Sequence, residues 1–339
     1  MARELTIGID LGGTTVKGGV VNKHGSILAT ATSESMASKG PATVIRQIRY
    51  TVEELLRQCK REEIVGVGVG APGVVGTDGS TVKYPPNFAD WAEVDLGREL
   101  EKALHLPIAV ENDANVAALA EARFGAGAGE SDFLFIIWGT GVGAGIILND
   151  DIYRGPHGGA GEIGHTTIDY NGPLCGCGNR GCVEAYVGQR YLSQRASERL
   201  LPLVEAWKHQ PTAAAPSKII ELLHGNLEML DPQILSQAAS LGDTIAREIL
   251  VEAGELLGTA IASVLNVLDL RIVIVGGGIS AVEPFVFEAI QRSVRARVLK
   301  GSKEQIRVRP AKLGNAAGIL GAASLPFIPK RTTSPRRAE

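Results

Sequence analysis

An apolar strand, a glycine–threonine turn and a second apolar strand follow one another twice in this sequence. The first copy lies in residues 5–22 and turns at Gly12-Gly13-Thr14-Thr15. The second copy lies in residues 133–149, about 130 residues later, and turns at Gly139-Thr140-Gly141. The recurrence predicts a duplicated β-meander, with one copy in each of two domains.

Helices and further strands are expected around these two copies. We expect helices over 41–60, 96–104, 114–124, 243–268, 282–299 and 315–323. Short apolar runs predict strands over 27–32, 64–69, 108–110, 152–153, 271–275 and 306–309. The Pro- and Gly-rich residues 71–87 are expected to form a loop. Together these elements predict an α/β fold.

The composition excludes several classes of protein. The 339 residues carry a formal net charge of -3, with 45% hydrophobic and 21% charged residues. This length suggests two domains with their own cores. The mild acidity gives no reason to expect nucleic acid or an anionic membrane as a partner. No apolar run approaches the ~18 to 20 residues that span a bilayer, and we expect no targeting segment, so we expect a cytoplasmic protein.

The glycine loops are candidate phosphate sites. A dinucleotide-binding fingerprint needs a helix after its glycines, whereas both glycine–threonine turns continue into strands. Tight hairpins can need glycine for geometry alone. The glycine–threonine turn occurs twice, and a third glycine loop lies at 276–278. This repetition instead favours loops whose successive backbone N–H groups bind the phosphates of a nucleotide. The residues concerned are Gly12, Gly13, Thr14, Thr15, Gly139, Thr140, Gly141, Gly276, Gly277 and Gly278.

Asp10 ends the first strand beside the first turn. A carboxylate there is well placed to hold Mg²⁺ against bound phosphates, directly or through water.

Three of the four cysteines, Cys175, Cys177 and Cys182, fall within eight residues, and His165 lies ten residues upstream. Three thiolates and one imidazole satisfy tetrahedral Zn²⁺. A disulfide between Cys175 and Cys177 would be strained by their proximity, so we expect a structural zinc site. Two acids, Glu162 and Glu184, bracket this loop. The metal would fix where these acids point, which suits a polyhydroxylated substrate. The fourth cysteine, Cys59, is expected on the apolar face of a helix, in the core.

The junction Asn112-Asp113 separates a predicted strand from a helix. Asn or Asp at this position commonly caps the helix. The carboxyl end of a sheet strand is also where α/β proteins place ligands, and a carboxylate there can accept the proton of an attacking hydroxyl. The spacing alone leaves the cap and the catalytic base as open alternatives.

Taken together, these motifs resemble those of the ROK family (repressors, open reading frames, kinases), most closely its zinc-containing glucokinases. Asp10-Leu11-Gly12-Gly13-Thr14 and Gly139-Thr140-Gly141-Val142-Gly143 are similar to the two phosphate motifs of the family. Val275-Gly276-Gly277-Gly278 resembles the adenosine motif. Gly161-Glu162-Ile163-Gly164-His165 and the cysteine loop resemble the family signature and zinc motif. The resemblance covers nearly the whole chain.

The resemblance implies an actin-like ATPase (ribonuclease H-like) fold. Two domains, each with a mixed β-sheet flanked by helices, would close over a cleft. We expect a small N-terminal domain of residues 1–112 plus about 314–326, and a large domain of residues 113–313 that contains the zinc loop. Residues 327–339 would form a polar, basic tail, disordered from 330 onward.

The resemblance also implies residue roles. Asp113 would be the base that activates the sugar 6-hydroxyl, and His165 would use one ring nitrogen for zinc and the other for the sugar. The other sugar-binding residues implied are Asn87, Asn112, Asp113, Glu162 and Glu184. Thr15 replaces a lysine that many members carry, and Trp138 is bulkier than the usual residue.

The activity implied is ATP-dependent phosphorylation of a hexose, with glucose converted to glucose 6-phosphate by a homodimer that uses Mg-ATP. Mannose, fructose or N-acetylmannosamine are alternative substrates, and polyphosphate is an alternative donor. A sugar-sensing repressor is an alternative function, but the first strand is predicted to begin near residue 5 and we expect no winged helix before it. A filament or chaperone ATPase is a third reading, for which the acids around the cysteine loop have no evident use.

Overall fold

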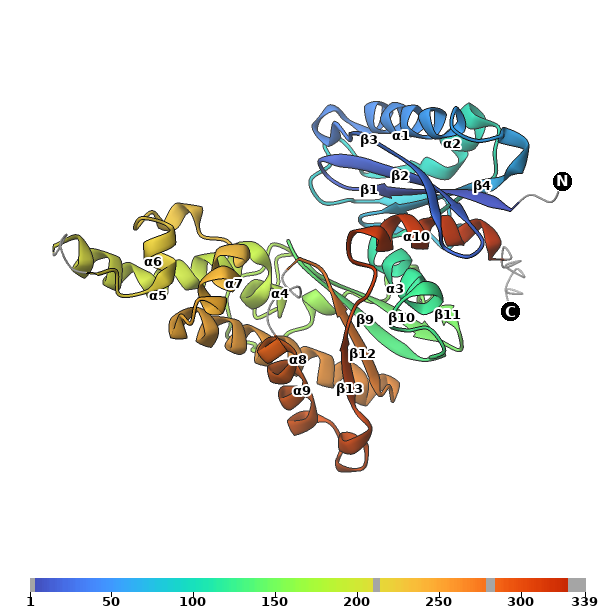
Figure 1. The fold of residues 1–339 in the computed structure, drawn as a ribbon. Coiled ribbons are helices and arrows are strands. Elements are labelled where there is room, and N and C mark those ends of the chain that lie inside the picture. Colours follow the sequence, from blue (N-terminus) through green and yellow to red (C-terminus); the bar gives the residue numbers. More distant parts are fainter. Residues whose placement is uncertain (1–3, 210–213, 279–283, 329–339) are drawn as a thin grey trace. The chain divides into compact units, whose positions relative to one another are not determined.

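The computed structural model describes residues 4–209, 214–278 and 284–328. The chain divides into two compact units (Figure 1). Unit 1 comprises Met1–Phe124, Arg154–Gly159 and Asn315–Glu339, and unit 2 comprises Gly125–Tyr153 and Ala160–Gly314. This division differs from the boundary expected after residue 112, because helix α3 (Asp113–Phe124) belongs to unit 1.

Unit 1 is built on a five-stranded sheet in the order β3-β2-β1-β4-β8. The strands are β1 (Leu5–Leu11), β2 (Thr15–Asn22), β3 (Ile27–Glu34), β4 (Ile64–Ala71) and β8 (Ile108–Asn112). The first three strands form the predicted antiparallel meander, whereas β4 and β8 run parallel to β1. The carboxyl ends of β1, β4 and β8 therefore share one edge of the sheet.

Helices cover both faces of this sheet. Helices α1 (Pro41–Leu56) and α2 (Leu96–Leu104) lie on one face, and α10 (Ala317–Ser324) lies on the other (Figure 1). Helix α10 lies directly on the strands because they carry glycine beneath it. A Cβ on Gly8 would lie 2.0 Å from a backbone oxygen of α10, and a Cβ on Gly68 would lie 1.8 Å from another.

Two expectations for unit 1 were wrong. Residues 71–87 are not a plain loop, since β5 (Val74–Val75) and β6 (Thr81–Lys83) pair with β7 (Glu93–Asp95) in a second, three-stranded sheet. Helix α1 ends at Leu56, so Cys59 lies in the turn after the helix and not on its face. Cys59 still packs, partly buried, against the core of unit 1.

Unit 2 repeats the same strand order in the sheet β11-β10-β9-β12-β13. Its strands are β9 (Phe133–Trp138), β10 (Val142–Leu148), β11 (Asp151–Ile152), β12 (Ile272–Gly276) and β13 (Arg307–Pro310). Strands β9, β10 and β11 form the antiparallel meander, and β12 and β13 are parallel to β9. The predicted duplication of the meander is confirmed.

The rest of unit 2 is mainly helical. Its helices are α4 (Glu184–Val187), α5 (Gln189–Lys208), α6 (Lys218–Leu222), α7 (Pro232–Ser240), α8 (Thr244–Leu268) and α9 (Pro284–Arg297). The helix expected from residue 282 begins outside the described residues, as does the tail from residue 330. None of the helices in the described ranges combines the length and apolar character that crossing a bilayer requires.

Candidate active-site residues in the two units

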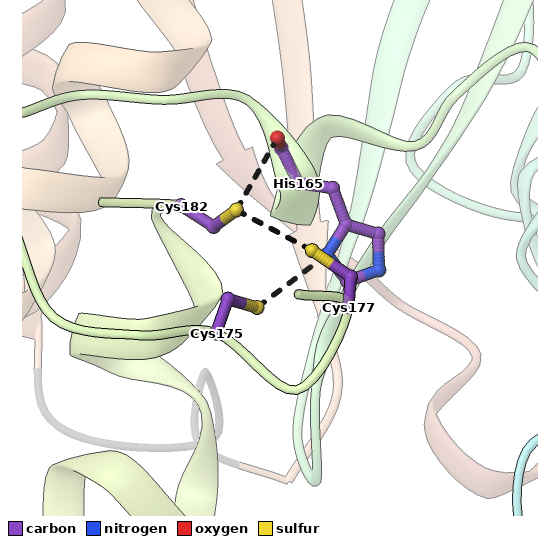
Figure 2. Close-up of side chains that lie close together, drawn as sticks. All are labelled: His165, Cys175, Cys177 and Cys182. Atoms are coloured by element: carbon purple, nitrogen blue, oxygen red, sulfur yellow. Dashed lines mark hydrogen bonds between the residues drawn. The ribbon is translucent and has the colours of Figure 1, made fainter. Parts of the chain in front are cut away.

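The predicted zinc ligands converge on one point in unit 2 (Figure 2). The ligand atoms of His165, Cys175, Cys177 and Cys182 all lie within 4.8 Å of one another. The Sγ atoms of Cys177 and Cys182 are 3.7 Å apart, as are Cys175 Sγ and His165 Nδ1. Tetrahedral bonds of ~2.3 Å to sulfur place two sulfur ligands ~3.8 Å apart. The four side chains therefore fit a Zn²⁺ ion.

The protonation of the thiols also suits a metal site. Burial raises the pKa of the Cys175 thiol, and it raises the pKa of Cys182 to about 12. A hydrogen bond from the backbone of Asn179 instead lowers the pKa of Cys177. Two buried thiols of this kind carry their protons near neutral pH unless a cation replaces them.

The expected sugar ligands of unit 2 lie around this cluster. Glu162 is exposed directly before the short 3₁₀ turn Ile163–His165, and Glu184 is the first residue of α4. Because His165 turns Nδ1 toward Cys175, Nε2 is the ring nitrogen that a substrate could meet. Both acids therefore lie within three residues of a member of the cysteine cluster in the chain.

The second glycine–threonine turn joins β9 to β10, and we call residues 139–143 the phosphate hairpin. The Gly139 N–H donates to the Gly141 carbonyl at 3.0 Å, which closes the tip. In the described part of the chain, the N–H groups of Thr140 and Gly141 have no hydrogen-bond partner. Adjacent unpaired N–H groups at a tight turn form a nest for phosphate oxygens.

The third glycine loop lies against this hairpin. Strand β12 pairs with β9, and Gly276 is in register with Ile137. Gly277 has φ 98°, and a Cβ on it would lie 2.3 Å from the Trp138 carbonyl oxygen. Only glycine fits there, because the position combines left-handed backbone with a close backbone contact. The fold therefore brings the second and third loops together.

The bulky Trp138 has a structural role at the base of the hairpin. Its side chain is fully buried, and its Nε1 donates to the Val187 carbonyl at 2.8 Å. The Gln189 N–H also donates to the Gly139 carbonyl, at 3.1 Å. These bonds attach the hairpin to the end of α4 and to the first residue of α5, the two helices that follow the cysteine loop.

The first glycine–threonine turn in unit 1 is held by a residue that the sequence reasoning missed. The buried Ser35 donates from its hydroxyl to the Gly13 carbonyl at 2.8 Å and from its N–H to the Thr14 carbonyl at 2.9 Å. The Gly12 N–H donates to the Thr15 carbonyl at 2.9 Å. The N–H groups of Gly13 and Thr14 have no partner among the described residues, as at the other hairpin.

Asp10 lies beside this turn at the carboxyl edge of the sheet. It is in register with Gly70 of β4, which is in register with Glu111 of β8. Burial raises the pKa of the Asp10 carboxyl above 3.8, while the charge of Lys17 opposes this shift. A half-buried carboxylate of this kind gains from a cation, which offsets the lost solvation.

The structure separates the roles of Asn112 and Asp113. The Asn112 side-chain oxygen accepts from the N–H groups of Ala114 at 2.9 Å and Asn115 at 3.2 Å. The cap of α3 is therefore provided by Asn112. The Asp113 carboxylate accepts from the adjacent Ala114 N–H at 2.8 Å. Asp113 lies at the same sheet edge as Asp10, two strands away.

An ion pair fixes the backbone just before these residues. Glu111 is 4% exposed and accepts from the Asn112 N–H at 2.9 Å and from the Asn115 side chain at 3.0 Å. Its second oxygen accepts from Arg154 Nε at 2.5 Å. Glu111 and Arg154 were not predicted as site residues, and they hold the position from which Asp113 projects.

Asn87, the remaining expected sugar contact, lies exposed in the loop after β6. Its φ of 67° is left-handed, which asparagine tolerates better than most residues. Unit 1 therefore holds Asp10, the first turn, Asn87, Asn112 and Asp113. Unit 2 holds the phosphate hairpin, the 276–278 loop, the two glutamates and the cysteine cluster.

Known proteins resemble the chain over almost its full length. A model of the ROK family matches residues 6–327. The glucokinase of Thermotoga maritima is 35% identical over 319 residues, which cover 94% of this chain and 96% of that protein. A putative xylose repressor of a Caldicellulosiruptor species is 30% identical over 323 residues, which cover 95% of this chain and 77% of that protein.

A solved structure is also similar to this chain in its fold. A ROK family glucokinase from Streptomyces griseus, in complex with glucose and AMPPNP, superposes with a TM-score of 0.80 at 35% identity. The match covers 95% of this chain and 98% of that one. This likeness confirms the expected actin-like ATPase fold.

Proposed function

Since the chain belongs to the ROK family, we propose that it is an ATP-dependent hexose kinase that phosphorylates glucose at its 6-hydroxyl. Two similar proteins support this proposal: the Thermotoga maritima protein is a glucokinase, and the Streptomyces griseus glucokinase was solved with glucose and AMPPNP bound. The proposal rests on the different positions of Asn112 and Asp113 at the start of α3. Asn112 caps the helix, and the carboxylate of Asp113, the first residue of α3, lies at the carboxyl edge of the sheet.

Unit 1 would supply the base and the magnesium ligand. Asp113 would orient the 6-hydroxyl and accept its proton late, since a loose phosphoryl transition state needs no unusually basic group. Asp10 would hold Mg²⁺ beside the phosphates, directly or through water. The unpaired N–H groups of Gly13 and Thr14 would face phosphate oxygens.

Unit 2 would supply the second phosphate hairpin and most of the sugar contacts. Glu162, Glu184 and Nε2 of His165 would bind sugar hydroxyls, because carboxylates accept and imidazole can donate or accept. Asn87 and Asn112 would add contacts from unit 1. Zn²⁺ held by His165 and the three cysteines would supply a rigid crosslink for the loop that carries these groups.

The finer assignments rest on resemblance and residue chemistry. Mannose differs from glucose in the configuration of its 2-hydroxyl, N-acetylmannosamine carries an acetamido group at that position, and fructose is a ketose, so contacts of these acids near C1 and C2 would distinguish them. Polyphosphate offers the same terminal phosphoryl group as ATP. The family resemblance also implies a homodimer, which light scattering of the purified protein would test.

A coupled assay over a panel of hexoses and donors tests the proposal. We expect sugar phosphate to form from Mg-ATP, with the highest kcat/KM for glucose. ATP hydrolysis that is independent of every sugar would contradict it and indicate another ATPase of this fold. Sugar binding without phosphoryl transfer would also contradict it and indicate a sensor, as in the repressor relatives.

A further inference from the structure

The carboxylate of Glu184 lies directly against the phosphate hairpin. Its Oε2 accepts a hydrogen bond from the Val142 N–H at 2.9 Å. Val142 is the first residue of β10, so this bond attaches the start of the strand to the acid. A Cβ on Gly141 would lie only 2.4 Å from the same oxygen. Glycine at position 141 is therefore what lets the carboxylate approach the hairpin tip.

The second oxygen of this carboxylate, Oε1, has no hydrogen-bond partner in the part of the chain that the structure describes. Glu184 is half-buried, so only one side of the carboxylate is open. Oxygen atoms of one carboxylate are related by a single torsion, because χ3 rotates both together. A group that binds Oε1 therefore also fixes the direction of Oε2.

Three hydrogen bonds attach the phosphate hairpin and Trp138 to the helices that follow the cysteine loop. Its β9 side is attached to α4 through Trp138 Nε1 and to the first residue of α5 through the Gly139 carbonyl. Its β10 side is attached to α4 through the bond from the Val142 N–H to Glu184. The N–H groups of Thr140 and Gly141, which directly precede Val142, are those available to phosphate. The orientation of the carboxylate thus bears on the orientation of these two donors.

We propose that Glu184 is a positioning residue that couples the binding of sugar and nucleotide, with Oε1 for the sugar and Oε2 for the hairpin. This inference rests on the proposed function and adds a regulation of the same site. When a sugar hydroxyl holds Oε1, the Val142 N–H is held in turn and the hairpin is ordered before phosphate arrives. Each substrate then binds more tightly when the other is bound, because the ordering entropy is lost only once.

Replacement of the hairpin donor tests the coupling without touching the acid. Val142→Pro removes the N–H at the first position of a strand, where proline is best tolerated. Val142→Ala is the matched control, since it shortens the side chain and keeps the N–H. Calorimetry would measure the Kd of a non-hydrolysable ATP analogue with and without saturating glucose. The ratio of the two values is the coupling factor.

In the wild type and in Val142→Ala we expect glucose to tighten binding of the analogue about fivefold or more. In Val142→Pro the factor falls to about one, while the Kd of glucose alone stays within about threefold of the control. Reciprocity requires the analogue to tighten glucose binding by the same factor. A factor of one in the wild type, or a full factor in Val142→Pro, would overturn the proposal.

A second variant covers the case in which Val142→Pro does not fold. Gly141→Ala keeps every polar group but inserts a Cβ 2.4 Å from Oε2, which displaces the carboxylate from the Val142 N–H. We expect the same loss of coupling in this variant, and an unchanged factor would contradict the proposal. A wild-type protein that binds neither glucose nor the analogue would instead show that the proposed function is wrong.

Discussion

The backbone of Gly318 lies directly against the carboxyl group of Asp10. A Cβ on Gly318 would lie 2.6 Å from Asp10 Cγ and 2.8 and 2.9 Å from its two oxygens. Gly318 belongs to the first turn of α10, which packs on β1. A residue near the C-terminus of the described chain therefore sets the position of the candidate magnesium ligand.

Gly318→Ala should accordingly displace Asp10 and slow phosphoryl transfer. We expect kcat/KM for Mg-ATP to fall by about 10- to 100-fold, as for misplacement of a reacting group by about 1 Å. Gly301→Ala is the control, since a Cβ there meets nothing within 4 Å. Steady-state kinetics of the two variants make the comparison. Equal activity in both would show that Asp10 has no need of this contact.

The raised pKa of Asp10 makes a prediction about stability. Burial raises the pKa of the Asp10 carboxyl in the folded protein above 3.8. The folded state therefore binds the proton of this carboxyl more tightly than the unfolded state does. The resulting stability is present below pH 3.8 and is lost as the pH rises through the folded pKa. Ionised Asp10 is therefore destabilising at neutral pH when no cation is bound.

Asp10→Asn should then raise the free energy of unfolding at pH 7 in magnesium-free buffer, and the gain should shrink toward pH 4. Denaturant titrations of the variant and wild type at both pH values measure it. Added Mg²⁺ should stabilise the wild type more than the variant. A gain that does not change with pH would mean that the Asp10 charge is not its source.

The capping role of Asn112 can be separated from sugar binding. Asn112→Ala should lower the free energy of unfolding by about 1 to 2 kcal/mol, because the N–H groups of Ala114 and Asn115 lose their acceptor. Asn112→Ser keeps a capping oxygen and should recover most of this stability. If the amide also binds the sugar, both variants should raise the KM for glucose. Equal stability of the alanine and serine variants would contradict the capping role.

Zinc binding should release protons from the cysteine cluster. Because the pKa of Cys182 is raised to about 12 without metal, this thiol must lose its proton when it binds zinc near pH 7. Calorimetry in buffers of different ionisation enthalpy should show release of at least about one proton, with affinity that rises with pH. Cys182→Ser should abolish stoichiometric zinc, whereas Cys59→Ser should not. Zinc that binds without proton release would contradict this ligand set.

Local patterns in the sequence predicted the features that are built from neighbouring residues. The two meanders were predictable from apolar runs on either side of a glycine turn. The cysteine cluster was predictable from the spacing of its histidine and cysteines over 18 residues, 165–182. Strands β5 and β6 were missed because two or three residues are too short to show alternation.

Contacts between distant parts of the chain were not predictable in the same way. Arg154 reaches Glu111 across 43 residues, and Ser35 holds the turn at Gly13 from 22 residues away. Asn112 and Asp113 could not be assigned as cap and base from spacing, because either side chain can accept from the first N–H groups of a helix. Hydrogen-bond geometry decides that Asn112 is the cap.

The most direct test of the central claim is the rate of glucose 6-phosphate formation by Asp113→Asn at saturating glucose and Mg-ATP. We expect kcat to fall by about 10² to 10⁴ relative to the wild type, with glucose affinity, zinc content and melting temperature retained. Loss of the general base alone explains that pattern, since Asn112 keeps the helix cap. A variant that retains kcat within about tenfold of the wild type would contradict Asp113 as the base.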